Sequence, residues 1–420
     1  MRGSLLAVAS IIVGIFILQA GNGLLASFLA LRMALEDFPG PVIGLVVTGY
    51  PLGFLVGCVL AQRLIREVGH IRAFAILAST FACATLLLAI YIEPFFWVCV
   101  RALSGFAASG LFMIGESWLS DKSPSHLRGR IFGIYTTSNM TAVSAGQLLL
   151  SAGDPKGLTL FMVAAGFICA SLIPVAMTRT TAPSRPQVKP LNLLDLYRLS
   201  PVGVVGAISA GLANTALGSI GPLFAQQIGL STVEIAHFMA ALLFGGLLLQ
   251  WPIGRLSDRV DRRKVLAAVM LLAVAVALAI ALFGRTLGLG LYGLILLYGG
   301  LAYTVYPLSV AQANDHADRS QVVSVSSGLL LSWACGSIVG PTAATAAMSI
   351  IGPQGLFFYT AVVSGLLCLF ALWRLLRRRP PPRESRRDFV AKSPTTPVAA
   401  KLDPRAGPGT DQPSMSDRAG

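Results

Sequence analysis

Charged side chains are scarce in this sequence. Asp, Glu, Lys and Arg together make up 12% of the 420 residues, and only 4 residues are histidine. No spacing of His, Cys, Asp and Glu is typical of a metal site, and no Walker-type phosphate loop or nucleophile elbow is present. These absences exclude an ATP-driven motor in this chain and argue against bond chemistry, so we expect no catalytic residue, no cofactor and no metal.

Apolar residues are abundant instead. They make up 55% of the chain, and the mean hydropathy is strongly positive. A helix that crosses a bilayer needs about 20 mostly apolar residues, and the stretches that meet this requirement are 5–31, 42–64, 71–92, 95–118, 130–152, 157–178, 201–225, 233–255, 264–284, 288–312, 322–348 and 355–376. Glycine and proline inside them favour closely packed helices over strands. We therefore expect an all-α membrane protein with twelve transmembrane helices.

Most of the lysine and arginine lies in every second loop between these stretches. Short cytoplasmic loops are enriched in both residues, so this placement predicts that the N- and C-termini are cytoplasmic. The formal net charge of +14 is spread over these loops and the tail, where it suits contact with the anionic inner leaflet of the lipid bilayer. We therefore expect no nucleic-acid partner.

The two halves of the sequence resemble each other at a shift of 192 to 194 residues. Asn22 aligns with Asn214 at the shorter shift, and Gly105 aligns with Gly299 at the longer one. The likeness is weak but ordered along the chain, as expected for an old duplication. The predicted domains are an N-terminal six-helix half at 1–178, a cytoplasmic linker at 179–199, a C-terminal six-helix half at 200–376, and a disordered basic tail rich in Pro and Arg at 377–420.

A dense cluster of charge separates the eighth and ninth apolar stretches. From Gly254 to Lys264 the chain reads G-R-L-S-D-R-V-D-R-R-K. This loop resembles the signature G-x-L-x-D-R-x-G-R-R-K of the major facilitator superfamily, with Asp261 in place of the second glycine. The corresponding loop of the first half departs from the pattern, because Gln62 and Arg66 stand where glycine and aspartate are expected.

The resemblance implies a charge network that latches the two halves together in one conformation and breaks in the other. Its members would be Gly254, Asp258, Arg259, Arg262, Arg263 and Asp315. Asp258 would face the amino end of the fifth span, where the helix dipole favours negative charge, and Arg262 or Arg263 would pair with Asp315. The alternative is that the basic residues only anchor the loop on the cytoplasmic side.

The fourth span carries an arginine and a glycine that resemble an R-x-x-x-G segment of the same superfamily. An arginine inside a span costs at least ~2.5 kcal/mol if it faces lipid, so we expect Arg101 to face protein or water. Family members use this position near the proton or substrate path. The alternative is that Arg101 extends to the outer surface, and Gly105 would serve helix packing.

The same span contains Glu116, the only acidic residue that we place clearly within a span. A carboxyl group in a desolvated setting can take up or release a proton as its surroundings open and close. We therefore consider Glu116 a candidate for proton coupling. The competing structural interpretation pairs it with Arg128 or Arg130 at the start of the fifth span.

Small residues and amides complete the candidate site. Gly336, Gly340 and Pro341 in the eleventh span bring small residues four apart, which permits close helix packing. Asn22 and Asn214 lie in spans one and seven, which line the central cavity in the fold of this superfamily. The polar, nearly uncharged pocket would be completed by Gln147, Asn139, Gln250 and Tyr303. The alternative role of these amides is hydrogen bonding between helices.

By this resemblance we expect a secondary active transporter in the inner (cytoplasmic) membrane of a bacterial cell. Its substrate would be a small neutral, amphipathic or weakly cationic organic molecule, because few charges are available inside the spans to bind an anion. Proton-coupled efflux by a monomer is the expected mode. The alternatives are an uncoupled facilitator, and a non-transporting receptor or scaffold whose basic tail recruits a partner.

Overall fold

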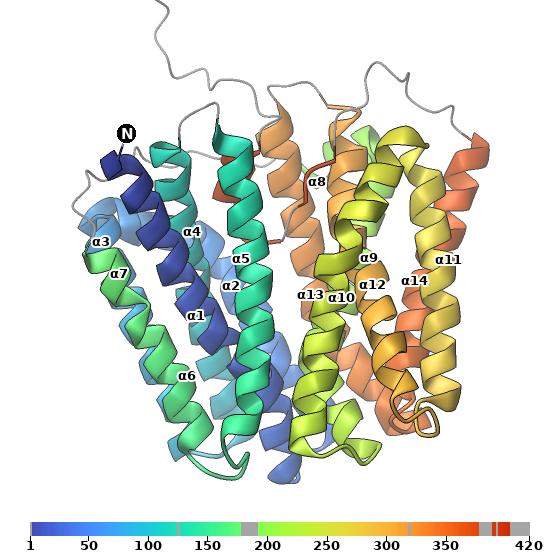
Figure 1. Cartoon of the computed structure of the whole chain (residues 1–420), viewed down its shortest axis with the longest axis horizontal. Helices are drawn as coiled ribbons and strands as arrows, with labels where there is room; N and C mark the ends of the chain where they lie inside the picture. The colour runs from blue at the N-terminus through green and yellow to red at the C-terminus, as the bar shows by residue number, and fades with distance from the viewer. Residues whose placement is uncertain are drawn as a thin grey trace, which may run out of the picture.

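The computed structural model describes residues 2–123, 127–177, 192–317, 321–377, 389–391 and 394–403. The chain forms a bundle of long helices that run side by side (Figure 1). The first group comprises α1 (Arg2–Leu35), α2 (Gly40–Val68), α3 (His70–Ile90), α4 (Pro94–Lys122), α5 (Arg128–Leu148), η2 (Leu149–Ala152), α6 (Thr159–Ala170) and α7 (Leu172–Ala176). The second comprises α8 (Leu193–Leu199), α9 (Pro201–Gln227), α10 (Thr232–Arg259), α11 (Arg262–Phe283), α12 (Gly290–Asn314), α13 (Val322–Ile351) and α14 (Gly355–Arg377), followed by η5 (Pro397–Leu402).

Eleven helices of the described chain are long and apolar enough to cross a membrane, with α6 and α7 counted as one segment. The fifth expected span corresponds to α5, which lies between α1 and α10 but is not among the eleven. It is less apolar because it carries polar side chains such as Thr136, Asn139 and Gln147, all of which are buried in the protein. The structure therefore confirms an all-helical membrane bundle, and the twelfth crossing stays a prediction.

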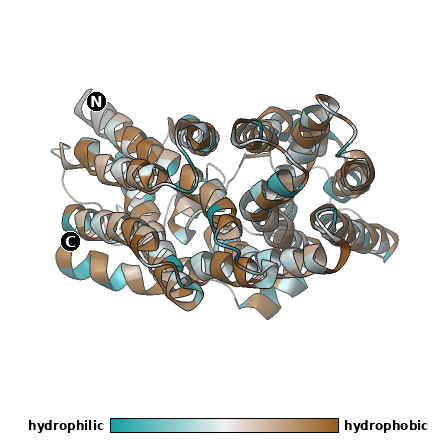
Figure 2. Cartoon of the chain, turned by 90° about the horizontal axis from the view of Figure 1, so that it is seen from below, coloured by the Kyte–Doolittle hydropathy of each residue, from teal (hydrophilic) through white to brown (hydrophobic). Residues whose placement is uncertain are grey.

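The outer surface of the bundle suits a lipid environment. Hydrophobic stretches lie on the outward faces of the helices around the rim (Figure 2). Large apolar side chains such as Ile90, Leu289 and Leu366 are exposed. A soluble protein would rarely leave so much apolar surface in contact with water.

The two groups of helices repeat one packing contact at equivalent glycines. A Cβ atom added at Gly105 in α4 would lie 2.0 Å from the backbone oxygen of Tyr50 in α2. One added at Gly299 in α12 would lie 1.8 Å from the backbone oxygen of Leu242 in α10. The glycines are 194 residues apart and their partners 192, so the internal repeat of the sequence corresponds to a repeat of backbone contacts.

A second glycine contact repeats in the same way. Gly146 in α5 lies against the backbone of Ala20 in α1, where a Cβ would be 2.0 Å from its oxygen. Gly340 in α13 lies against Leu212 in α9, where the corresponding distance is 2.4 Å. One turn earlier, Gly336 lies against the backbone of Ile208, so the small residues of α13 form one side of a close α9–α13 contact.

The two ends of the bundle differ in charge. The connection between α10 and α11 lies at the end where α1 begins and α14 ends (Figure 1). We name this the basic end, after Arg259, Arg262 and Arg263, and the opposite end the far end. That the basic end faces the cytoplasm stays a prediction.

The two groups meet at the far end and are spaced apart toward the basic end. In α2, the Thr48 hydroxyl donates to the backbone oxygen of Ile338 at 2.9 Å and lies 3.1 Å from the Thr342 hydroxyl, both in α13. Nearer the basic end, a pocket of about 350 Å³ separates α2 from α13 and is closed on one side by Pro397. The interface therefore opens toward the basic end.

The glycine contacts lead to a stability prediction. Gly105→Ala should lower the free energy of unfolding by about 1–3 kcal/mol, because the added methyl group forces α2 and α4 apart. Gly166→Ala in α6 is the matched control, since nothing lies within 4 Å of the Cβ position and alanine is the better helix former. Thermal unfolding in detergent measures both. Equal melting temperatures for the two variants would contradict the prediction.

Candidate functional site

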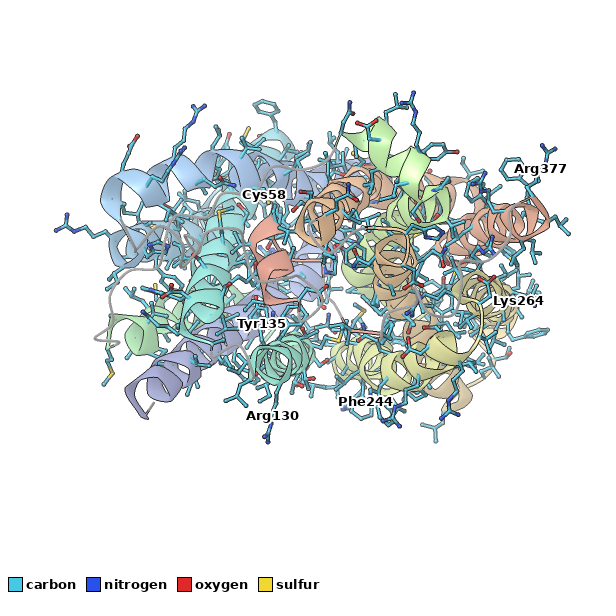
Figure 3. All side chains as sticks on the ribbon, turned by 90° about the horizontal axis from the view of Figure 1, so that it is seen from above. Cys58, Arg130, Tyr135, Phe244, Lys264 and Arg377 are labelled. Atoms are coloured by element: carbon cyan, nitrogen blue, oxygen red, sulfur yellow. The ribbon has the colours of Figure 1, made fainter. Side chains whose placement is uncertain are left out.

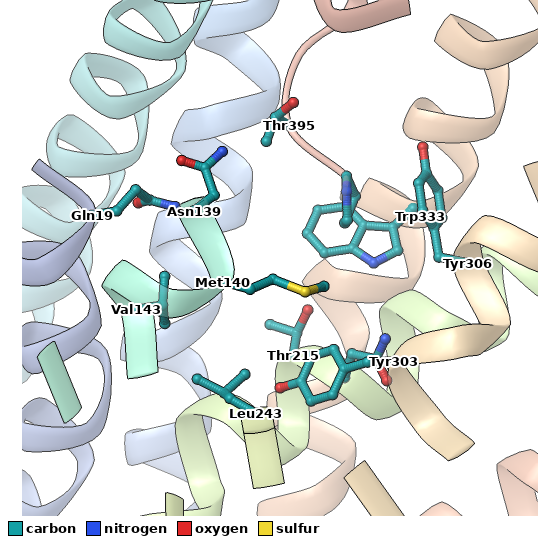
Figure 4. Close-up of a pocket in the computed structure, with 12 residues that line it drawn as sticks. Gln19, Asn139, Met140, Val143, Thr215, Leu243, Tyr303, Tyr306, Trp333 and Thr395 are labelled. Atoms are coloured by element: carbon teal, nitrogen blue, oxygen red, sulfur yellow. The ribbon is translucent and has the colours of Figure 1, made fainter. Parts of the chain in front are cut away.

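A cavity of about 250 Å³ lies between the two groups of helices (Figure 4). Helices α1 and α5 contribute to one wall, and α9, α10, α12 and α13 contribute to the other. The lining residues are Gln19, Asn139, Met140, Val143, Asn214, Thr215, Leu243, Tyr303, Tyr306, Trp333, Pro394 and Thr395. None of these side chains is charged, so the cavity offers amides, hydroxyls and aromatic rings.

Several polar atoms at the cavity wall have no hydrogen-bond partner within the described part of the chain. They include the amide oxygen Oδ1 of Asn214 and the indole Nε1 of Trp333. Buried polar groups are normally hydrogen-bonded, so a ligand that brings a donor to Asn214 and an acceptor to Trp333 would satisfy both. Met140 extends across the middle of the cavity toward Trp333 (Figure 4) and supplies a flexible apolar surface.

The amides expected from the sequence separate into two sets. Asn214 lines the cavity, together with Asn139 and Tyr303. Asn22 is not among the lining residues. Its side chain donates a hydrogen bond of 3.2 Å to Oε1 of Gln19, and Gln19 lines the cavity. Gln147 is buried and is not among the lining residues.

Sequence reasoning missed several lining residues. Gln19 precedes Asn22 by three residues, and side chains three apart share a helix face, so this spacing was a usable signal. Thr215, Tyr306 and Trp333 gave no such signal, because a threonine or an aromatic residue in an apolar stretch is as common at a helix contact as in a cavity.

Glu116 lies in α4 and is completely buried. The Tyr135 hydroxyl of α5 donates to its Oε1 at 2.8 Å. The Thr396 hydroxyl donates to its Oε2. The two carboxylate oxygens are thus bound by uncharged hydroxyl groups. Arg130, one partner considered from the sequence, is exposed at the bundle surface, and the side chain of the other, Arg128, lies outside the described residues.

Arg101 is also buried, with 6% of its surface exposed. Its guanidinium carbon lies 4.6 Å from the ring centre of Tyr50 in α2, a distance at which a cation is attracted to an aromatic face. Its Nε and Nη1 atoms have no hydrogen-bond partner among the described residues. The side chain therefore faces protein, close to the Gly105 contact, and it is not among the residues that line the cavity.

The loop from Gly254 to Lys264 places a buried charge network at the basic end. Nε of Arg262 lies 2.7 Å from Oδ2 of Asp315, and both side chains are 1% exposed. Nη1 of Arg262 lies 3.0 Å from Oδ1 of Asp258 and donates to the Ser257 hydroxyl at 2.8 Å. One arginine at the start of α11 therefore ties the end of α10 to the end of α12.

Asp258 was expected to face the start of the fifth span. Its carboxylate lies 3.0 Å from Nη1 of Arg262 in its own half, and residues 124–126 before α5 lie outside the described part of the chain. Arg259 is exposed to solvent and is therefore available for contacts at the basic end.

Asp261, which replaces the second glycine of the signature, caps the start of α11. Its carboxylate accepts a hydrogen bond from the backbone N of Arg263 at 3.0 Å and lies 2.8 Å from Nη2 of the same residue. A carboxylate at a helix amino end satisfies an unpaired N–H group and is favoured by the helix dipole. Arg263 thus pairs with Asp261, whereas Arg262 pairs with Asp315.

Comparisons with known proteins agree with this architecture. The family model of the Major Facilitator Superfamily matches residues 11–329 and 203–407. The chain is 28% identical to the uncharacterized MFS-type transporter YcaD of Escherichia fergusonii over 361 residues, which cover 86% of this chain and 93% of the relative. It is 28% identical to YcaD of Salmonella enteritidis PT4 over 364 residues, with the same coverage of 86% and 93%.

Solved structures share the fold at low sequence identity. The nucleoside transporter NupG superposes with a TM-score of 0.72 at 14% identity and covers 90% of this chain and 100% of its own. A bacterial homologue of the human lysosomal transporter Spinster, inward-facing and occupied, superposes with a TM-score of 0.70 at 15% identity. This match covers 90% of this chain and 97% of the homologue. A D-xylose–proton symporter superposes with a TM-score of 0.69 at 13% identity, and the match covers 88% of this chain and 96% of the symporter. These likenesses show the fold alone.

The buried charge network leads to a second stability prediction. Asp315→Asn should lower the free energy of unfolding by about 3 kcal/mol, because it leaves the buried Arg262 with a weaker partner. Arg259→Gln removes an exposed charge from the same loop and should change stability by less than about 0.5 kcal/mol. Chemical denaturation of the purified protein compares them. Similar midpoints for both variants would show that the Arg262–Asp315 pair is not a stabilising contact.

Proposed function

Because the chain belongs to the major facilitator superfamily, we propose that it is a secondary active transporter that moves a small neutral, amphipathic or weakly cationic organic solute by alternating access. Membership of this family supports a multi-pass membrane transporter rather than an enzyme. Its relatives are bacterial, which supports the inner (cytoplasmic) membrane as its location. In this proposal it acts as a monomer and exports its solute in exchange for protons.

The uncharged cavity between the two groups of helices carries the proposal. Its wall combines amides, hydroxyls and aromatic rings, and none of the described residues that line it is a lysine, an arginine or an acid. A strongly anionic solute would need cationic partners there, because burying an unpaired charge costs far more than burying a hydrogen-bonded neutral group. At about 250 Å³ the cavity is slightly smaller than a typical drug-sized site, which favours a small solute.

The names of two structural neighbours are consistent with this chemistry. One neighbour is a nucleoside transporter and another is a D-xylose–proton symporter. Nucleosides and D-xylose are neutral molecules rich in hydroxyl groups, which amides and aromatic rings bind well. Labelled uridine and D-xylose are therefore the first probes to use, with ethidium as a cationic probe.

The asymmetry of the interface supports alternating access. The hydrogen bonds of Thr48 close the far end, whereas α2 and α13 are spaced apart toward the basic end. Transport would require the halves to rock about the cavity, so that the far end opens when the basic end closes. The Arg262–Asp315 pair lies within one half and would brace α10, α11 and α12 so that they move together.

Glu116 is our candidate for proton coupling. It lies on α4 beside the basic-end opening and is bound by the hydroxyls of Tyr135 and Thr396. Cys58 and Tyr306 are among the titratable side chains of the described residues that lie near it, and Tyr306 also lines the cavity. A proton on Glu116 would therefore be exchanged close to the bound solute.

The first functional prediction concerns coupling. In proteoliposomes under an imposed pH gradient, the wild-type protein should move protons only when uridine, D-xylose or ethidium is present. Glu116→Gln should abolish this proton movement and retain exchange of the solute, because an amide cannot ionise. The matched control is Glu234→Gln, since Glu234 is an exposed acid at the far end whose helix-capping role glutamine can keep.

The outcomes of this assay separate the alternatives. Solute flux that is insensitive to an uncoupler, in both the wild type and Glu116→Gln, would point to an uncoupled facilitator. Binding of a probe without flux, together with a cellular phenotype lost on deletion of residues 380–420, would point to a receptor or scaffold. Full proton coupling in Glu116→Gln would remove Glu116 from the mechanism.

The second functional prediction concerns the cavity wall. Asn214→Ala should raise the half-saturating concentration of the transported probe about tenfold, which corresponds to about 1.4 kcal/mol for one hydrogen bond. Gln227→Ala, at the exposed end of the same helix, should leave it unchanged. Both values come from initial rates at varied probe concentration. An unchanged value for Asn214→Ala would show that the solute does not contact α9 at this position.

A further inference from the structure

A short segment of the C-terminal tail lies between the two groups of helices at the basic end. Figure 3 shows it at the centre of the bundle, with Cys58 and Tyr135 on either side. Residues Pro397–Leu402 form η5, and the side chains of Val398 and Leu402 are 0% exposed. The composition of residues 377–420 predicts disorder, so this ordered, buried segment differs from that expectation. The difference has a physical reason, because Val398 and Leu402 find apolar cover only once the helices are assembled.

Both groups of helices contact the segment. On one side, the Thr396 hydroxyl donates to the Glu116 carboxylate of α4. On the other side, α13 packs against η5. A small space around the segment is lined by Phe132, Tyr306, Ser326, Leu330, Thr395, Thr396, Ala399 and Ala400. The segment therefore bridges the two halves at the place where they are spaced apart.

The segment also closes the central cavity. Pro394 and Thr395 are part of the cavity wall, and Pro397 lies on the wall of the pocket between α2 and α13. Thr395 lies on the side of the cavity toward the basic end, opposite Leu243 and Tyr303 (Figure 4). These residues therefore stand between the cavity and the basic end.

The tail approaches its binding position across the signature loop. A Cβ atom added at Gly254 would lie 2.2 Å from a ring carbon of Phe389. The aromatic ring of a tail residue thus covers the first glycine of the signature, which lies in α10, and a methyl group there would force this ring to shift. Phe389 precedes the buried segment by a few residues and fixes where the tail enters the interface.

We propose that the described residues of the tail, 389–391 and 394–403, form a tethered plug that binds in the basic-end opening and holds the transporter closed at the far end. This inference rests on the proposed alternating-access function. The halves cannot close at the basic end while η5 lies between α4 and α13, so the far end cannot open. The plug also caps Glu116, because Thr396 holds the carboxylate oxygen that would exchange a proton on this side. Turnover therefore requires release of the plug.

Tethering makes this binding feasible without high intrinsic affinity. Eleven residues, 378–388, separate the end of α14 from Phe389 in the sequence. A short tether of this kind gives an effective local concentration on the order of millimolar. A weak peptide site would then be mostly occupied, yet it would release the plug often enough for regulation.

The first experiment tests whether the plug is bound. Val398→Cys, in a protein whose native cysteines are replaced, should react with a maleimide at least about tenfold more slowly than Lys264→Cys, because a bound plug exposes the thiol for a small fraction of the time. Lys264 is an exposed residue at the same end of the bundle and serves as the control. Equal alkylation rates would overturn the proposal.

The second experiment tests whether the plug controls the far end. Cysteines introduced at Thr48 and Thr342, whose hydroxyl oxygens are 3.1 Å apart, should cross-link rapidly with copper phenanthroline. Truncation after Arg377 should lower the initial cross-linking rate at least about threefold, because the far end then opens part of the time. A synthetic peptide of residues 389–403 should restore the rate, and deletion of residues 404–420 alone should leave it unchanged.

A second variant tests the same prediction in the full-length chain, so that poor folding of the truncated protein cannot explain the result. Val398→Asp in the full-length chain places a charge at a 0% exposed position of the plug and should lower the cross-linking rate as truncation does. An unchanged rate in both variants would overturn the proposal. Neither readout needs a solute, so a failure to transport uridine, D-xylose or ethidium would count against the proposed function and leave this test intact.

Discussion

Close backbone contact at glycines is the constraint on which the rest of this structure depends. Lipid tails are as apolar as leucine, so helices in a bilayer gain little from the hydrophobic effect and associate through tight packing instead. At Gly105 and Gly299 the helices approach so closely that not even a methyl group fits between them. These contacts build each half as a rigid unit, and the cavity lies where the two units are held apart.

The repeated scaffold carries a charge distribution that is not repeated. The second half has a buried network centred on Arg262 and Asp315, whereas the first half has Gln62 and Arg66 at the positions of the signature glycine and aspartate. The first half instead carries Glu116, which is fully buried and bound by hydroxyl groups. In this proposal the two halves have different roles. The second half keeps its helices together by an ion pair, and the first half exchanges a proton.

Conformational control in this proposal comes from the chain itself. The opening at the basic end, the carboxylate of Glu116 and the signature glycine Gly254 are three separate features of the bundle, and the described tail residues 389–391 and 394–403 contact all three. A plug that touches the cavity, the proton site and the loop would couple them, because its release frees all three at once. The C-terminal tail would therefore act as a regulator and not only as a carrier of positive charge.

The sequence by itself determined the helical membrane bundle, the equivalence of Gly105 with Gly299, and the set of charges around Arg262, because apolar length, repeat spacing and loop composition are local properties. Only the tertiary structure decided which amides share a cavity, that Arg101 lies over Tyr50, and that Arg262 rather than Arg263 pairs with Asp315. It also decided that Val398 and Leu402 are buried. These outcomes depend on side chains brought together from helices far apart in the chain, and no local pattern records which of two equivalent partners lies within reach.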